Sequence, residues 1–302
     1  MSQIKTIDLY FLGHSETIAA YLVETSAGPA LIETGPHSTL PYLKKGLQAY
    51  GYSLQDIKHV FLSHIHLDHA GAAWYFAQHG AQIYVHPFGI RHLAAPEKLM
   101  ASAKRIYQDQ MDRLWGEMNA IPLEQLQAIE HEQSIKIGEF EFIAHHTPGH
   151  AVHHIAWQIG EDLIAGDVAG VKVGPYPVVP PCPPPDINVE DWQQSIQLIR
   201  NLSIQRIHLT HFGQAEDVNS LLDDLESSLI AWANWMKPYV LRQADPKEVT
   251  PLFQAYVQQQ LIDKGVDKAS LQRYEAANPS WMSVAGLMRY WKKREAKSAS
   301  KS

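Results

Sequence analysis

The alternation of apolar and polar residues divides the first two thirds of the chain into short strands and amphipathic helices. Apolar or alternating runs predict strands at residues 4–11, 19–23, 29–32, 60–62, 140–144, 152–158, 162–165 and 206–209. A helical period predicts helices at residues 40–50, 70–78, 91–94, 99–119 and 191–201. Periodicity alone therefore predicts a mixed α/β fold.

The chain changes character after residue 213. Helical patterns occupy residues 218–236, 246–264, 268–277 and 282–294, and the dipeptide Asn278-Pro279 interrupts the series. We therefore expect residues 214–294 to form a C-terminal helical subdomain beside the strand-containing part. The polar residues 295–302 are expected to be a disordered tail.

Composition narrows the class of protein. With 302 residues and 45% hydrophobic content, the chain can form one large core and an appendage. It has no apolar run near the roughly 18 residues that span a bilayer, and no signal-peptide pattern. Its single cysteine, Cys182, excludes an intrachain disulfide. We expect a cytoplasmic protein with no membrane partner, and the net charge of −7 argues against a nucleic-acid partner.

The densest group of chemically active side chains is the segment from Ser63 to His69, which reads Ser-His-Ile-His-Leu-Asp-His. It follows an apolar run at residues 59–62, so the group comes directly after a predicted strand. Imidazole is the commonest protein ligand for zinc-like ions, and aspartate adds the negative charge that a dication needs. Packing alone does not explain such a cluster, and a metal centre does.

Three further ligand-type residues follow downstream, each just after a strand-like run. His150 ends the segment 147–150, Asp167 ends the segment 165–167, and His211 lies within the segment 209–213. Ligands at the ends of several strands can converge on one edge of a sheet, where short loops hold them rigidly. The sequence therefore predicts one metal centre assembled from four places in the chain.

The order His-x-His-x-Asp-His, then His, Asp and His, resembles the metallo-β-lactamase superfamily over residues 4–213. The hydroxyacylglutathione hydrolase (glyoxalase II) and lactonase types are the most similar branches. The resemblance implies a four-layered αβ/βα sandwich, with residues 1–213 as the catalytic domain. It also implies two divalent metals, with zinc expected and iron or manganese as alternatives. One metal would be held by His64, His66 and His150 and the other by Asp68, His69 and His211, with Asp167 bridging them.

This family pattern implies a dinuclear hydrolase in which a metal-bridging hydroxide attacks a carbonyl carbon. Two dications bring more positive charge than two carboxylates and a hydroxide remove, and the excess suits an anionic transition state. Asp68 and Asp167 are the candidate catalytic residues, because either carboxylate can relay a proton to the leaving group. The expected substrates are thioesters, other activated esters or lactones.

Three positions depart from branches of the family. Glu33 stands where an Asp is usual; it either accepts a hydrogen bond from a ligand histidine or is an ordinary loop carboxylate. Gly170 stands where lactonases usually have Tyr, although Tyr176 is a candidate substitute. Asp167 stands where the commonest β-lactamases have Cys. The alternative functions are a mononuclear iron oxidoreductase similar to persulfide dioxygenases, and a phosphodiesterase.

The substrate pocket is expected to be walled by three segments outside the core pattern. These are a helical insertion at residues 88–120, a proline-rich loop at residues 171–185, and the C-terminal helices. Tyr107, Trp115 and Tyr176 offer apolar bodies with polar tips, and His14 lies in a loop expected to overhang the site. The insertion can equally pack on the core, and the loop can equally bind a partner domain. The expected partner is a small-molecule substrate with an apolar acyl group, and a homodimer is one option for the assembly.

Overall fold

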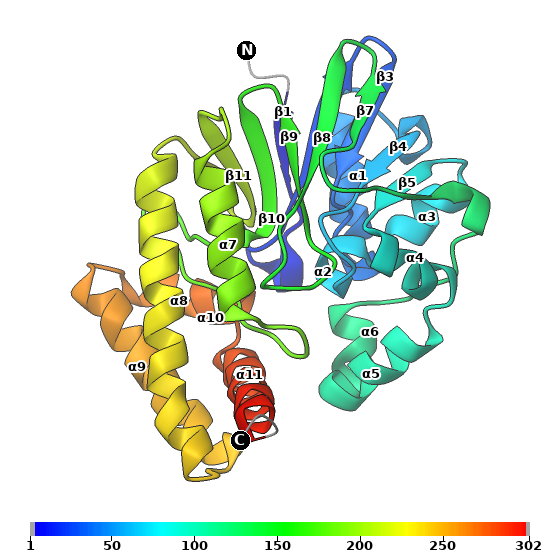
Figure 1. Cartoon of the computed structure of the whole chain (residues 1–302). Coiled ribbons are helices and arrows are strands. Elements are labelled where there is room, and N and C mark those ends of the chain that lie inside the picture. The colour runs from blue at the N-terminus through cyan, green and yellow to red at the C-terminus, as the bar shows by residue number, and fades with distance from the viewer. Residues whose placement is uncertain (1–3, 300–302) are drawn as a thin grey trace.

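Two six-stranded sheets pack face to face in the computed structural model, which describes residues 4–299 (Figure 1). In the first sheet the strands follow chain order: β1 (Ile4–Asp8), β2 (Ala19–Thr25), β3 (Gly28–Ile32), β4 (His59–Phe61), β5 (Gln82–Val85) and β6 (Leu126–Ala128). The second sheet runs in the order β12-β11-β10-β9-β8-β7. Its strands are β7 (Ser134–Ile137), β8 (Phe140–His146), β9 (Ile155–Ile159), β10 (Asp162–Val171), β11 (Arg206–His211) and β12 (Gly213–Ala215).

The inner strands are buried on both faces, which explains their continuous apolar sequences. All ten residues of β10 are buried, as are the first five of β2. A strand covered by a helix on one face and by a sheet on the other has no face in contact with solvent, so its sequence need not alternate between apolar and polar residues. Between the sheets, the ring of Phe61 stacks on that of Phe142 with centroids 4.2 Å apart and meets the edge of Trp157 at 5.0 Å.

Helices cover the outer face of each sheet (Figure 1). On the first sheet, α1 (Leu40–Ala49) and α3 (Ala73–Gln78) bury Leu43, Leu47 and Phe76 against the strands. On the second sheet, α7 (Val189–Arg200) and α8 (Val218–Leu241) do the same with Trp192 and Leu225. The four-layered αβ/βα sandwich expected from the sequence is confirmed.

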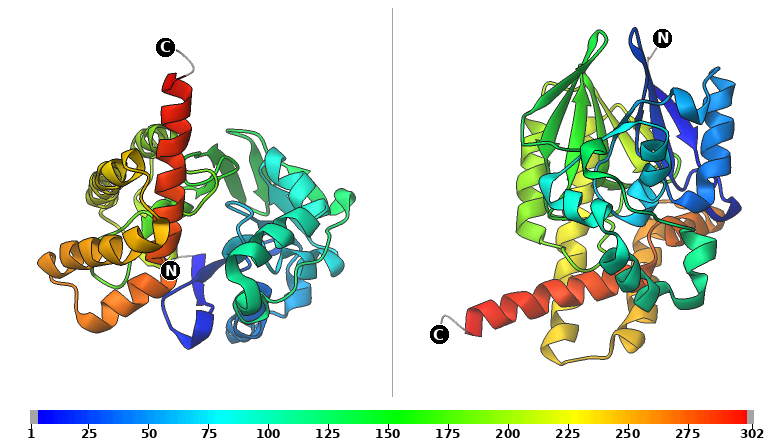
Figure 2. Two further views of the ribbon diagram at one scale, coloured as in Figure 1. Left: turned by 90° about the horizontal axis from the view of Figure 1, so that it is seen from below. Right: turned by 90° about the vertical axis from the view of Figure 1, so that its right-hand side faces the viewer.

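Two helical regions lie at one end of this sandwich (Figures 1 and 2). The insertion forms α4 (Pro87–Ala94), α5 (Glu97–Tyr107) and α6 (Met111–Leu114), and the C-terminal region forms α9 (Pro246–Asp263), α10 (Lys268–Ala277) and α11 (Ser280–Ala299). The C-terminal helices share one hydrophobic cluster with β10 and α8, to which Phe253 and Met288 contribute. The predicted C-terminal helical region is therefore present, and it packs directly on the second sheet. Within the described residues, no helix is both long and apolar enough to cross a membrane.

Several predicted boundaries were wrong. The helix expected at residues 99–119 ends at Leu114, and the one expected at 70–78 is divided between α2 (Leu67–Ala70) and α3. The strand expected from residue 152 begins at Ile155, because residues 152–153 form a turn after His150. The tail expected to be disordered from residue 295 continues α11 to Ala299, and residues 300–302 lie outside the described part of the chain.

A charged group fixes the start of the two strands that deliver Asp167 and His211. The carboxylate of Asp162 on β10 accepts two hydrogen bonds from Arg206 on β11, at 2.7 and 2.8 Å, and lies 2.7 Å from the Nε2 of His208. Burial by itself would raise the pKa of Asp162, but the hydrogen bonds from Arg206 and His208 outweigh it and lower that pKa well below its usual range.

We expect Asp162→Asn to lower the free energy of unfolding by about 2 kcal/mol near neutral pH, because it weakens hydrogen bonds between charged groups. A carboxyl whose pKa is lowered by folding stabilises the protein above its unfolded pKa of about 4, and this stabilisation is lost as the pH falls toward the folded pKa. Urea unfolding at several pH values should show the two proteins converging in acid. The matched variant is Asp223→Asn. The side chain of Asp223 is 70% exposed and pairs with Arg200, so its loss should change the free energy of unfolding little. An equal effect of both variants on the free energy of unfolding would contradict the stabilising role of Asp162.

Candidate metal centre

All seven predicted ligands lie together at one end of the sandwich. The loop after β4 carries His64 and His66, and the short helix α2 that follows it carries Asp68 and His69. His150 lies in the turn after β8, Asp167 lies within β10, and His211 ends β11. Three groups each have ligand atoms within 4.8 Å of one another: His64, His66 and His150; His64, His69 and Asp167; and Asp68, His69 and His211. The first and third groups match the two ligand sets expected from the sequence.

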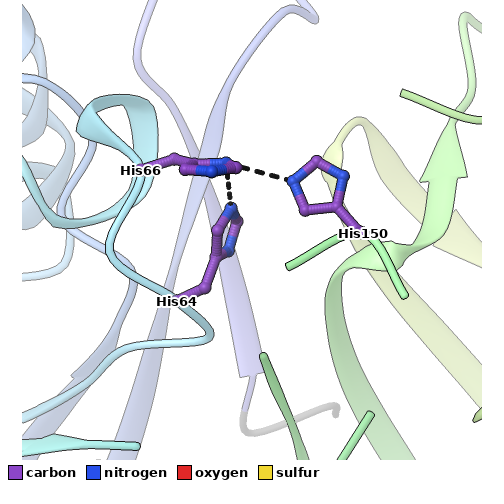
Figure 3. A group of neighbouring side chains, drawn as sticks. All are labelled: His64, His66 and His150. Carbon is purple, nitrogen blue, oxygen red and sulfur yellow. Dashed lines mark hydrogen bonds between the residues drawn. The ribbon is translucent and has the colours of Figure 1, made fainter. Parts of the chain in front are cut away.

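The first group consists of three imidazoles whose nitrogens point at one another (Figure 3). The Nδ1 of His66 lies 2.8 Å from the Nε2 of His64 and 3.1 Å from the Nε2 of His150. The second group is bounded by the carboxylate of Asp68, whose Oδ2 lies 3.5 Å from the Nε2 of His211 and 3.8 Å from that of His69.

Asp167 lies between the two groups and offers one oxygen to each. Its Oδ2 is 3.2 Å from the Nε2 of His150, and its Oδ1 is 3.2 Å from the Nε2 of His69 and 3.3 Å from that of His211. The side chain is buried. A carboxylate in this position has the geometry that a bridging ligand requires.

Two buried atoms at this centre lack hydrogen-bond partners among the described residues. They are the Nε2 of His69 and the Oδ1 of Asp167, which face each other without hydrogen-bond geometry. Buried polar atoms are nearly always satisfied, so a pair without partners marks a place for another group. Imidazole nitrogen and carboxylate oxygen are donors suited to zinc and similar divalent ions. The residues therefore fit a metal, and the chain forms a binding site for divalent cations.

In three of the ligand histidines, the ring nitrogen that points away from the centre, Nδ1, has a hydrogen-bond partner. The Nδ1–H of His150 donates to the carbonyl of Pro181 at 2.9 Å, and that of His211 donates to the carbonyl of Thr17 at 2.7 Å. The Nδ1 of His64 lies 2.9 Å from the hydroxyl of Ser63. Such partners fix the ring orientation and direct the other nitrogen into the centre. Thr17 and Pro181 act through backbone carbonyls, so the sequence carries no signal for them.

Glu33 lies behind His69. Its fully buried carboxylate places Oε1 at 3.1 Å from the Nδ1 of His69 and accepts longer contacts, both of 3.4 Å, from the amide of Ser63 and the hydroxyl of Thr210. The sequence left two alternatives for Glu33, a hydrogen-bond acceptor for a ligand histidine or an ordinary loop carboxylate. The position of Glu33 favours the first. The longer side chain thus reaches a ligand histidine.

The electrostatics of the metal-free centre divide its histidines into two kinds. Burial lowers the pKa of His66 to about 3 and that of His64 well below its usual value, so both imidazoles are neutral. For His69, burial is outweighed by the carboxylates of Asp167, Glu33 and Asp68, which raise its pKa well above the usual value. Burial alone would raise the pKa of Asp68, but the neighbouring His69 and His211 lower it to about 2. The carboxylate of Asp68 therefore stays ionised and can bind a cation.

His154, which lies within the strand expected at residues 152–158, was not among the candidate site residues, yet the structure places it beside Asp167. It is fully buried, and its Nε2 accepts a hydrogen bond of 3.1 Å from the amide of Asp167. Since Nε2 is the acceptor and burial lowers the pKa of His154 well below its usual value, the proton of the neutral ring resides on Nδ1 and is donated to the hydroxyl of Thr147 at 2.8 Å. Gly166 completes the arrangement: its φ is +53°, and a Cβ there would lie 2.7 Å from the Nε2 of His154.

A cavity of about 510 Å³ opens beside the centre. The ligands His66, Asp68, Asp167 and His211 line it, together with residues of α5 and α6. Further lining residues come from the loop between β1 and β2 (Phe11, Leu12 and Ile18), from the prolines of residues 181–185, and from residues 275–282. Tyr107 and Trp115 line this cavity as expected. His14 and Tyr176 do not line it. His14 is exposed, and the hydroxyl of Tyr176 donates a hydrogen bond of 2.8 Å to Asp267, which is not a lining residue either. A larger open hollow of about 890 Å³ over α7 contains none of the candidate ligands.

The sandwich and the convergent imidazoles and carboxylates define a protein with a metal-binding site at one end of a four-layered αβ/βα fold. The chain belongs to the metallo-beta-lactamase superfamily, whose family model matches residues 16–211. A metallo-beta-lactamase fold-containing protein, ST1585 of Sulfurisphaera tokodaii, is 25% identical over 164 residues, which are 53% of this chain and 62% of that protein. The chain thus matches less than two thirds of the length of this curated relative.

Solved structures share the fold at low sequence identity. The metallo-beta-lactamase family protein TTHA1429 from Thermus thermophilus has a TM-score of 0.64 at 19% identity, with 98% of this chain and 95% of that chain covered. The metallo-beta-lactamase GOB-18 from Elizabethkingia meningoseptica has a TM-score of 0.54 at 19% identity, with 76% and 88% covered. The match to TTHA1429 extends over the C-terminal helices, so they belong to the shared fold.

We expect zinc loading to place about two ions on each chain and to release protons. Coordination needs a neutral imidazole, whereas the carboxylates raise the pKa values of His69 and His211 in the metal-free protein against the effect of burial. Metal affinity should therefore weaken as the pH falls. Metal analysis after dialysis gives the count, and calorimetry in two buffers of different ionisation enthalpy gives the protons released. A count of one, or the same heat in both buffers, would contradict this expectation.

We expect His154→Leu to weaken zinc binding by about tenfold or more, because it leaves the amide of Asp167 buried without an acceptor and frees the carboxylate to move. His154→Gln can restore an acceptor near the position of Nε2 and should recover most of the affinity. Competition with a chromophoric chelator measures both. Equal affinities of the Leu and Gln variants would show that the hydrogen bond to Asp167 does not matter.

Proposed function

We propose that this protein is a dinuclear metal-dependent hydrolase that acts on the carbonyl of a thioester or another activated ester. The observation that carries the proposal is the position of Asp167, which presents one oxygen to His150 at 3.2 Å and the other to His69 and His211 at 3.2 and 3.3 Å. A complete set of ligands on each side of one carboxylate favours two metals over one. For that reason the mononuclear iron oxidoreductase is the weaker alternative.

The protein's own residues supply binding, orientation and proton transfer. His64, His66 and His150 would hold one ion, Asp68, His69 and His211 the other, and Asp167 both. When bound, such ions polarise a carbonyl and make water a nucleophile near neutral pH. The ionised carboxylate of Asp68 lines the cavity and its side chain is 23% exposed, so it can accept a proton from attacking water and pass it to the leaving group. Held by Glu33, Thr17 and Pro181, the histidines need no rearrangement during turnover.

The surroundings of Gly170 weigh against lactonase chemistry that uses a tyrosine at this position. The residue has a φ of +88°, and a Cβ on it would lie 2.6 Å from Val178 and 2.8 Å from Leu225. A tyrosine therefore has no room there, and Tyr176 does not line the cavity. Thioesters and open-chain esters remain better supported than lactones.

Phosphodiester hydrolysis is less well supported for electrostatic reasons. No lysine or arginine is among the described residues that line the cavity, so an anionic phosphate has no cationic side chain to pair with. The expectations of zinc as the metal, a cytoplasmic location, and a homodimer as one option for the assembly remain predictions.

We expect the zinc-loaded protein to hydrolyse S-acyl N-acetylcysteamine thioesters faster than a neutral lactone or bis(4-nitrophenyl) phosphate. Asp167→Asn should lower the thioester rate by about two orders of magnitude or more, because it removes charge and bridging capacity together. The matched variant Asp224→Asn lies on the surface, paired with Lys264, and should hydrolyse at the wild-type rate. Wild-type turnover by a folded Asp167→Asn variant, or activity on the phosphodiester alone, would refute the proposal.

A further inference from the structure

The cavity beside the metal centre has no charged group free to bind a substrate. Apart from the candidate metal ligands, the only acidic or basic side chain among its described lining residues is Glu275. Both oxygens of Glu275 are already used: Oε1 accepts the amide of Ser280 at 2.9 Å and Oε2 accepts its hydroxyl at 2.6 Å. A substrate portion bound here meets neither a cation nor an available anion.

The polar atoms that remain are also mostly occupied. The hydroxyl of Tyr107 donates to the Sδ of Met282 at 3.4 Å, and the amide of Asn278 donates to the carbonyl of Pro180 at 3.1 Å while its oxygen accepts from Ser283. Ser102, Gln110 and the Nε1 of Trp115, which has no hydrogen-bond partner among the described residues, are the other polar groups in the wall. The rest of the wall is formed mainly by aromatic, aliphatic and proline side chains, among them Phe11 and Trp281.

The cavity is bounded on two sides by segments far apart in the sequence. From α5 on one side, Tyr107 reaches Met282 and comes edge-on to Trp281, with ring centroids 6.0 Å apart, at the start of α11 on the other side. The contact links the two sides of a mainly apolar cavity that the metal ligands also line. Its volume of about 510 Å³ is in the range of sites that bury most of a small ligand, roughly 300–1,000 Å³.

We propose that this cavity binds the acyl chain of the substrate, and that this chain is an uncharged linear hydrocarbon of medium length. The proposal rests on the hydrolase function proposed above and adds the substrate class. A peptide-like thiol with several carboxylates, as in glutathione thioesters, has no cationic partner in this cavity, so such substrates should bind poorly. Each methylene buried should instead raise kcat/KM by roughly three- to fourfold until the cavity is filled.

Ala103 allows this to be tested without touching the metal ligands. It lies on α5 with its side chain buried in the cavity wall, whereas Ala101 on the same helix is exposed and is not in the wall. Ala103→Trp should fill part of the cavity and Ala101→Trp should not. The two variants are matched in residue type, helix and size change.

The experiment compares kcat/KM for acetyl, butanoyl and octanoyl N-acetylcysteamine thioesters and for S-lactoylglutathione. The wild type and Ala101→Trp should both prefer octanoyl to acetyl by at least tenfold and should use S-lactoylglutathione poorly. Ala103→Trp should lose most of this preference. Equal kcat/KM values of the wild type for the three chain lengths would overturn the proposal. The same dependence of kcat/KM on chain length in the two variants would overturn it as well.

A binding measurement separates this inference from the proposed function. The neutral dye N-phenylnaphthylamine should bind to the wild type and be displaced by octanol far better than by ethanol, whether or not hydrolysis occurs, and Ala103→Trp should bind it more weakly. Such binding without any thioester hydrolysis would refute the proposed function and leave the apolar site supported. Hydrolysis without chain-length dependence in either assay would refute the acyl site alone.

Discussion

A buried carboxylate surrounded by imidazoles is the interaction on which the rest of this structure depends. Asp167 has no water shell, and burial alone would raise its pKa; His69, His150 and His211 outweigh this and lower its pKa well below the usual value. Without them, or a cation in their place, an ionised carboxylate in this interior would be strongly destabilising. His69, His150 and His211 are thus a condition for burying Asp167 as well as candidate ligands.

The backbone around Asp167 is shaped to place this charge. The pairing of β10 with β11 shifts register on both sides of Gly166, between Ile164 and Gly166 and again between Gly166 and Val171. Irregular pairing of this kind redirects a side chain that a regular strand would place elsewhere. The amide freed from the ladder is the one that His154 accepts. The same irregularity therefore creates the position of the carboxylate and the need for a buried histidine beside it.

The sequence predicted the fold class and brought forward the seven side chains that meet at the centre, because metal-binding chemistry restricts which residue types can serve. Of the groups that hold those side chains, it brought forward only Glu33, and that as one of two alternatives. The carbonyls of Thr17 and Pro181 are available in any residue, and His154 was hidden within an apparent strand. Tyr176 was misplaced for a different reason: prolines restrict the path of the 171–185 loop without specifying which face each side chain takes. Tyr107 and Trp115 both line the cavity, but they do so from the ends of two separate helices, α5 and α6, and not from one face of the single helix that the sequence predicted.

The proline-rich loop couples the metal centre to the substrate cavity. Pro181 accepts the hydrogen bond that orients His150, while its neighbours Pro180 and Cys182 are bound from the C-terminal region by Asn278 and Ser283. Pro183, Pro184 and Pro185 then form part of the cavity wall. Because proline fixes the backbone angle φ, a displacement of the cavity wall cannot be taken up by backbone rotation within this loop. The family model ends at residue 211, yet the position of a ligand histidine depends on contacts made by residues 278–283. The cavity-lining elements outside the family core can therefore vary only as far as they keep Pro181 in place.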